Sequence, residues 1–121
     1  MRPWVLLAGL NGLMAIGFGA YAAHGLAGDA VLQGWAERAS NYQLLHALAL
    51  LAADRLAADG RRLGHGAAAL FLAGVVLFSG SLYLRALIGA PLPIPMVTPA
   101  GGMALMAGWL VLGLAGISRR R

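Results

Sequence analysis

Tyrosine, histidine, serine and arginine side chains recur in this sequence at spacings that could build a binding site. Tyr42 and His46 are four residues apart, as are Ser79 and Tyr83, so each pair lies on one face of a helix. Because polar groups inside long apolar stretches are costly, they are candidates for function by default. The candidate ligand-binding residues are His24, Trp35, Tyr42, His46, Ser79, Ser81, Tyr83, Arg85 and Thr98.

Two of these residues raise the possibility of a metal or haem site. His24 and His46 are imidazoles on neighbouring predicted helices, a common arrangement in helical bundles. Their spacing is not diagnostic, and neither a cysteine nor a nearby helix carboxylate supports it. We therefore predict no metal ligands and no cofactor.

A serine hydrolase is the second chemical alternative. It would combine Ser79 or Ser81 with His46 and an acid that orients the histidine. Only Asp29 and Glu37 fall toward the same end of the chain's predicted helices, and both lie in a connection. We therefore predict no catalytic residues, and a protein that is not an enzyme.

Arg85 suggests a different kind of chemistry. An arginine near the end of an apolar helix can extend to lipid phosphates or pair with Glu37. With His46 and Tyr83 it could hold an anionic headgroup or a quinone-like carbonyl. The simpler alternative is a polar network that only locks the helices together.

Two further polar residues are expected to be structural. Asn11 precedes Ala15 by four residues on a face of small side chains, so its amide should hydrogen-bond to a neighbouring helix. Asp54 could carry protons in a transporter, but pairing with Arg55, Arg61 or Arg62 is the more common outcome.

The composition predicts where these residues reside. The 121 residues are 60% hydrophobic and only 11% charged, with a mean hydropathy of +0.77. A soluble domain is about a quarter charged, so this chain needs lipid as its solvent. The net charge of +5 comes from arginines at the ends of apolar runs, which indicates topology rather than nucleic-acid binding.

The apolar runs predict an all-α membrane protein with four helices in a single domain, residues 1–121. About 20 helical residues cross the hydrocarbon core of a bilayer. We place the helices at about residues 4–23, 30–57, 66–88 and 99–118, and read the first as a retained span rather than a signal peptide. Leu32, Trp35 and Ala39 also repeat at helical spacing, so a short helix at the membrane interface is expected between the first two spans, with Asp29 as its N-cap.

Arginine placement predicts the orientation. Arg2, Arg55, Arg61, Arg62 and residues 119–121 fall on one side, and only Arg38 and Arg85 on the other. Under the positive-inside rule, both termini are cytoplasmic in a bacterial inner membrane. The candidate ligand-binding residues would then gather near the outer leaflet. Trp109, in the middle of the last helix, is expected to pack inside the bundle or between subunits.

Four blocks of the sequence resemble those of a known family. Residues 19–24, Gly-Ala-Tyr-Ala-Ala-His, resemble a Gly-Ala-Phe-Gly-Ala-His motif in the YgdD/YwdK-like family of small bacterial membrane proteins. Trp35 with Tyr42 and His46, residues 77–83 (Leu-Phe-Ser-Gly-Ser-Leu-Tyr), and Thr98-Pro99 with Trp109 match the other three blocks. The resemblance implies four helices and an inner-membrane location. It implies no reaction, substrate or cofactor.

The sequence therefore favours a non-enzymatic binding or accessory protein. Its polar cluster could hold a lipid, a quinone or a larger membrane-protein partner. Expected partners are membrane lipids, with a homo-oligomer or a larger membrane complex possible and no nucleic acid. The alternative is a small oligomeric transporter or channel, which would need a continuous polar track across the membrane.

Overall fold

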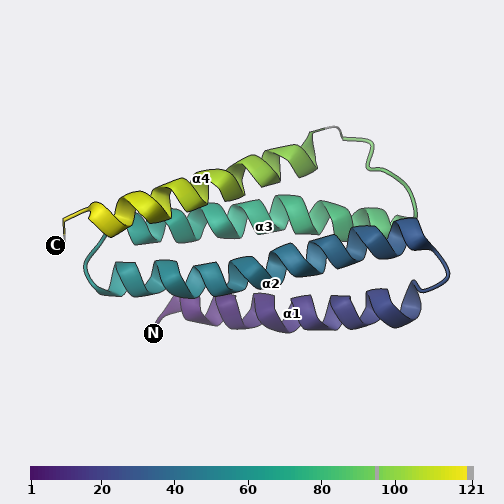
Figure 1. Cartoon of the computed structure of the whole chain (residues 1–121), viewed down its shortest axis with the longest axis horizontal. Helices are drawn as coiled ribbons and strands as arrows, with labels where there is room; N and C mark the ends of the chain where they lie inside the picture. Colours follow the sequence, from purple (N-terminus) through teal and green to yellow (C-terminus); the bar gives the residue numbers. More distant parts are fainter. Residues whose placement is uncertain (95, 120–121) are drawn as a thin grey trace.

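The computed structural model describes residues 1–94 and 96–119, and over these it consists of four α-helices joined by short connections (Figure 1). The start of α1, the α2–α3 turn and the end of α4 lie at one end of the molecule, which we call the terminal end. The α1–α2 and α3–α4 connections lie at the opposite loop end. The helices are α1 (Pro3–Gly25), α2 (Ala30–Ala58), α3 (Leu63–Ile88) and α4 (Val97–Ile117).

Consecutive helices pack side by side. Helix α1 packs on α2, α2 on α3 and α3 on α4, whereas α2 and α4 touch only slightly. Helices α2 and α3 therefore form the centre, and α1 and α4 flank it (Figure 1). The predicted all-helical, four-helix architecture is confirmed.

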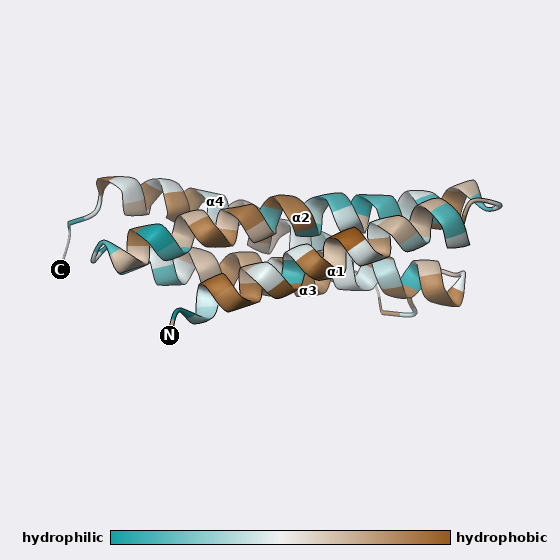
Figure 2. Ribbon diagram, turned by 90° about the horizontal axis from the view of Figure 1, so that it is seen from below, coloured by the Kyte–Doolittle hydropathy of each residue, from teal (hydrophilic) through white to brown (hydrophobic). Residues whose placement is uncertain are grey.

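The outer surface of this bundle is apolar. Within the described residues, three helices, α1, α3 and α4, are long and apolar enough to cross a membrane. Figure 2 colours long stretches of the helices brown for hydrophobic residues, and large side chains such as Leu13, Met106 and Leu110 are exposed. Lipid is the solvent that such a surface requires. Helix α2 does not reach the same hydropathy because it carries most of the polar residues.

Helix α2 corrects one prediction. The expected short helix at the interface does not exist separately in the described part of the chain, because residues 30–40 form the first three turns of α2. Asp29 does cap it, with Oδ1 accepting the backbone N–H groups of Val31 and Leu32 at 3.0 and 3.1 Å. Ala36 and Ala39 are fully buried, so these turns pack within the bundle rather than lie on a membrane surface.

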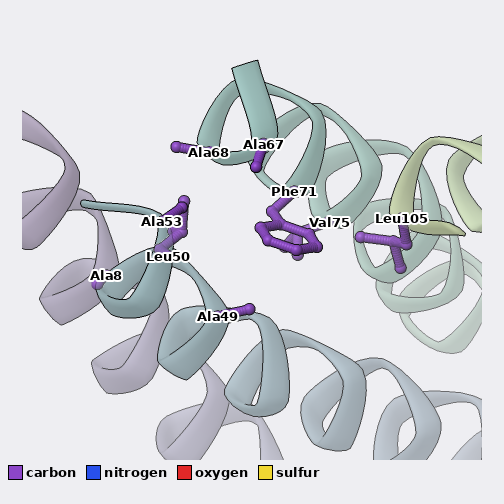
Figure 3. Packing of buried hydrophobic residues seen from close by; sticks show 9 residues of the cluster. All are labelled: Ala8, Ala49, Leu50, Ala53, Ala67, Ala68, Phe71, Val75 and Leu105. Atoms are coloured by element: carbon purple, nitrogen blue, oxygen red, sulfur yellow. The ribbon is translucent and has the colours of Figure 1, made fainter. Parts of the chain in front are cut away.

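Small side chains set the distances between the helices. Figure 3 shows nine buried residues of the main apolar cluster, among them the aromatic Phe71 of α3 and Leu105 of α4. A Cβ atom at Gly108 would lie 2.7 Å from the Phe71 ring, and one at Gly101 would overlap the backbone of Phe78. Helices α3 and α4 can therefore approach this closely only because glycine occupies these positions.

Polar contacts fasten the terminal end. Arg2 forms an ion pair with the buried carboxylate of Asp54, where the sequence suggested Arg55, Arg61 or Arg62 as its partner. Arg61 instead donates to the backbone carbonyl of Ser118 at the end of α4. The N-terminal end of α1 and the C-terminal end of α4 are thus each bonded to a residue at or near the α2–α3 turn.

Candidate functional site

A chain of hydrogen bonds crosses the interior of the bundle through three helices. The Asn11 amide of α1 donates to the Leu7 carbonyl at 2.8 Å, and its Oδ1 accepts from Nε2 of Gln43 at 3.0 Å. Oε1 of Gln43, in α2, accepts from the Tyr83 hydroxyl of α3 at 2.7 Å. We call Asn11, Gln43 and Tyr83 the polar chain. All three residues are buried, so the chain joins α1, α2 and α3 inside the apolar bundle.

The local sequence explains why these side chains meet. Buried residues of α2 recur every three or four positions, and Gln43 falls in that series between Ala39 and His46. The Tyr83 ring stacks on Phe18 of α1, with 4.2 Å between ring centroids. This ring contact bridges α1 and α3, whose backbones scarcely approach each other, beside the hydrogen bond from the Tyr83 hydroxyl to Gln43.

The polar chain forms the base of a groove between α1 and α3. This part of the groove has a volume of about 340 Å³ and is lined mainly by apolar side chains of both helices, with Asn11, Gln43 and Tyr83 among them. It continues toward the loop end as a wider space of about 710 Å³, which Leu92, Pro93, Ile94 and Val97 border on one side. Met14, Val76, Gly80 and Tyr83 line both parts. We call the whole the α1–α3 groove.

The α1–α3 groove opens to the outside of the bundle. Met14 is 48% exposed and Val76 63% exposed, so the lining is accessible from the surface that faces lipid. Gly80 sits between these walls, and a Cβ atom there would meet nothing within 4 Å. The groove is therefore a lateral opening with a polar base.

His46 makes a second polar contact, between α2 and α4. Its Nδ1 lies 2.7 Å from the Tyr42 carbonyl, and its Nε2 accepts from the Trp109 indole N–H at 3.0 Å. Since Nε2 is an acceptor, the proton of the neutral ring resides on Nδ1 and is donated to that carbonyl. Both ring nitrogens are occupied, so His46 has none to offer a metal. Trp109 packs against Phe71 as well and is half-exposed, which accounts for its mid-helix position.

The histidines do not come together. The Gln33 side chain donates to the Ala22 carbonyl, which places the end of α1 beside the start of α2. His24 is exposed in that last turn of α1, while His46 lies thirteen residues beyond Gln33, about 20 Å along α2. Among the described residues, no three His, Cys, Asp or Glu side chains lie close enough to hold a metal ion.

The serines join helices rather than form a catalytic group. The Ser79 hydroxyl is completely buried and donates to the Ala39 carbonyl at 2.8 Å. Ser81 lies 2.5 Å from the Thr98 hydroxyl and donates to the Phe78 carbonyl. Their partners are thus backbone carbonyls and another hydroxyl.

The remaining candidates lie toward the loop end. Trp35 packs against Ala22, Ala36 and Ala86. Arg85 stands in the last turn of α3 and forms no ion pair with Glu37 in the described part of the chain. The candidates are therefore spread along the helices: the polar chain and His46 lie near the middle, and Arg85 and His24 lie near the loop end. That these residues bind a ligand stays a prediction.

Sequence reasoning missed Gln43 and Ser40. Ser40 donates to the Ala15 carbonyl at 2.7 Å and so ties α2 to α1. The signal for Gln43 was available, because its spacing from Ala39 and His46 already placed it on the buried face of α2.

Comparison with known proteins assigns the chain to a family. Residues 18–102 match the family model described as "Protein of unknown function (DUF423)". The chain belongs to this family. Similar curated proteins include a UPF0382 membrane protein of Staphylococcus epidermidis, 39% identical over 95% of both chains. The UPF0382 membrane protein YwdK of Bacillus subtilis is 36% identical over 97% of this chain and 98% of its own.

The family likeness extends beyond these two organisms. A UPF0382 membrane protein of Haemophilus influenzae is 33% identical over 92% of this chain and 90% of its own. No solved structure matches. The relatives are named membrane proteins, in agreement with the three helices long enough to span a bilayer, so this family member is an integral membrane protein. The resemblance to the YwdK-like family is confirmed.

Proposed function

We propose that this protein is a non-enzymatic binding protein that holds a membrane amphiphile in the α1–α3 groove. The observation that carries the proposal is the position of the polar chain at the base of an apolar groove that opens to lipid. A ligand with an apolar chain would fill the groove and exclude other lipids from it.

The dimensions favour a chain-like ligand. The groove follows α1 from Leu7 to Phe18, a helical rise of about 17 Å. Its two parts, about 340 and 710 Å³, are within the range of small-molecule sites. Acyl and isoprenoid chains have this elongated apolar shape, so the ligand class is a lipid or a quinone with a long tail.

The transport alternative has less support. A transporter needs polar groups along the membrane normal, whereas the polar chain runs across the bundle from α1 to α3. In the described part of the chain, the buried face of α2 between His46 and the Arg2–Asp54 pair is apolar and consists of Ala47, Ala49, Leu50 and Ala53.

The proposal includes a location and an orientation. All four helices cross a bacterial inner membrane, because α2 is as long as its neighbours and lies between α1 and α3 at the same depth. Both termini are cytoplasmic, because Arg2, Arg55, Arg61 and Arg62 are at the terminal end, and Arg38 and Arg85 are at the loop end.

The test is to fill the α1–α3 groove with a larger side chain of the protein itself. Replacing Gly80 with phenylalanine should place a ring in the α1–α3 groove without a clash, since nothing lies within 4 Å of its Cβ position. Gly113→Phe in α4 is the matched control, because that glycine is equally free of neighbours and is exposed outside the groove. Native mass spectrometry of protein purified in mild detergent measures the retained amphiphile.

We expect the wild type and Gly113→Phe to retain the same amphiphile, and Gly80→Phe to lose most of it. Equal retention by all three proteins would overturn the proposal. A wild-type protein that carries no amphiphile but retains a protein partner would replace it with the accessory-subunit reading.

A further inference from the structure

The Arg85 guanidinium at the loop end has a consequence for the ligand. Arg85 lies in the last turn of α3, and its Nε atom is buried and has no hydrogen-bond partner among the described residues. A buried donor without an acceptor is destabilising, and more so when it belongs to a charged group. An acceptor from outside the chain would remove this cost.

The acidic residues at the loop end do not supply the missing acceptor for Arg85. Asp29 is engaged as the N-cap of α2. Glu37 is exposed and forms no ion pair in the described part of the chain. The partner that Arg85 requires is therefore an anion from the surroundings.

Arg85 lies one helical turn beyond a lining residue of the α1–α3 groove. Leu77 and Ser81 line its wide part, and Arg85 follows Ser81 by four residues along the same row of α3. Arg85 therefore lies in the last turn of α3, beyond the lining residue Ser81 and toward the loop end, although it does not itself line the groove. An amphiphile with its tail in the groove would bring its head to this position.

We propose that Arg85 binds the phosphate of an anionic phospholipid whose acyl chain occupies the α1–α3 groove. Guanidinium presents parallel N–H donors that match phosphate oxygens, and phosphate is the anion present at this depth in every bilayer leaflet. This inference rests on the proposed function and specifies the ligand's head. An anionic phospholipid is favoured over a zwitterionic one because no headgroup ammonium competes for the phosphate.

The experiment measures lipid selectivity. Purified protein is equilibrated with an equimolar mixture of phosphatidylglycerol and phosphatidylcholine of identical chains, and native mass spectrometry counts the bound molecules of each. We expect the wild type to prefer phosphatidylglycerol about tenfold. Arg85→Gln should retain lipid but lose the preference.

Arg38→Gln is the matched control. Arg38 is also at the loop end, is exposed on α2, and lies outside the groove lining. This variant should keep the wild-type preference. Arg85→Lys preserves the charge and should keep part of the preference, which provides a second test if Arg85→Gln fails to fold.

Several results would overturn the inference. They are a preference that survives in Arg85→Gln, one lost equally in Arg38→Gln, or a wild type that does not discriminate. Displacement of phosphatidylglycerol by millimolar inorganic phosphate would assign Arg85 to free phosphate instead of lipid. Lipid retained without selectivity overturns this inference alone, whereas full retention in Gly80→Phe overturns the proposed function.

Discussion

The side-chain amide of Gln43 donates to Oδ1 of Asn11 at 3.0 Å and thereby joins α2 to α1 in the apolar interior. The same side chain accepts the Tyr83 hydroxyl, so one glutamine connects three helices. In a bilayer, water is absent from the interior, and each of these groups depends on the others for a partner. The polar chain is therefore both a structural lock and the floor of the α1–α3 groove.

Removal of the Tyr83 hydroxyl should weaken the connection that the polar chain makes between the helices. Tyr83→Phe deletes the donor to Gln43 and should lower the free energy of unfolding by about 0.6–1.7 kcal/mol, as for other hydrogen bonds between membrane helices. Tyr42→Phe is the control, because Tyr42 is exposed and its hydroxyl has no hydrogen bond within the described residues. Unfolding in mixed micelles measures both, and equal losses would contradict the role of the polar chain.

The α3–α4 interface should not tolerate a methyl group at Gly101. Gly101→Ala places a Cβ against the backbone of Phe78, so the two helices must separate, at a cost of about 1–3 kcal/mol. The neighbouring Gly102→Ala would meet the Phe78 ring only at 3.8 Å, an ordinary contact. Thermal unfolding in detergent should therefore show a lower Tm for Gly101→Ala only. Two equally stable variants would mean that the helices are farther apart than described.

The buried carboxylate of Asp54, at the terminal end, should contribute more to stability than the more exposed carboxylate of Asp59. Asp54→Asn leaves Arg2 without its ionic partner and should destabilise the protein by about 1–3 kcal/mol. Asp59→Asn removes an acid that pairs with Arg55 on the surface, where such pairs contribute little. The comparison uses the unfolding midpoint of each variant at neutral pH. A larger loss for Asp59→Asn would show that the Arg2 contact is dispensable.

The orientation can be measured with single cysteines, since the natural chain has none. Ala90→Cys lies at the loop end and Ala58→Cys at the terminal end, and both positions are exposed. In intact cells, a thiol reagent that does not cross the inner membrane should label Ala90→Cys alone. Labelling of Ala58→Cys alone would reverse the topology and place Arg85 in the cytoplasmic leaflet.

Much of the fold follows from the sequence because lipid imposes simple constraints. The apolar runs had to become helices, and the prolines between residues 89 and 99 had to separate two of them. The first turns of α2 were harder to place. Glu37 and Arg38 resemble an interfacial pattern, but Ala36 and Ala39 provide the small face that packs them into the bundle.

The arrangement of the site was less predictable. Spacing along one helix shows which residues share a face, yet it does not show how far two helices slide past each other. His24 and His46 were expected near one depth, but the Gln33–Ala22 contact sets the α1–α2 register and separates them. The Arg2–Asp54 pair escaped prediction for the same reason, since fifty-two positions separate its members. The α1–α3 groove depends on the packing of both helices against α2, which no local pattern encodes.

The most direct test of the groove is photo-cross-linking with a lipid that carries a diazirine in its acyl chain, followed by mapping of the modified peptides. We expect modification to concentrate on the groove residues Met14, Val76 and Gly80, and Gly80→Phe to remove this concentration. Modification spread equally over these residues and the exposed Leu110 and Leu114 of α4 would contradict it, because the groove would then be ordinary lipid-facing surface.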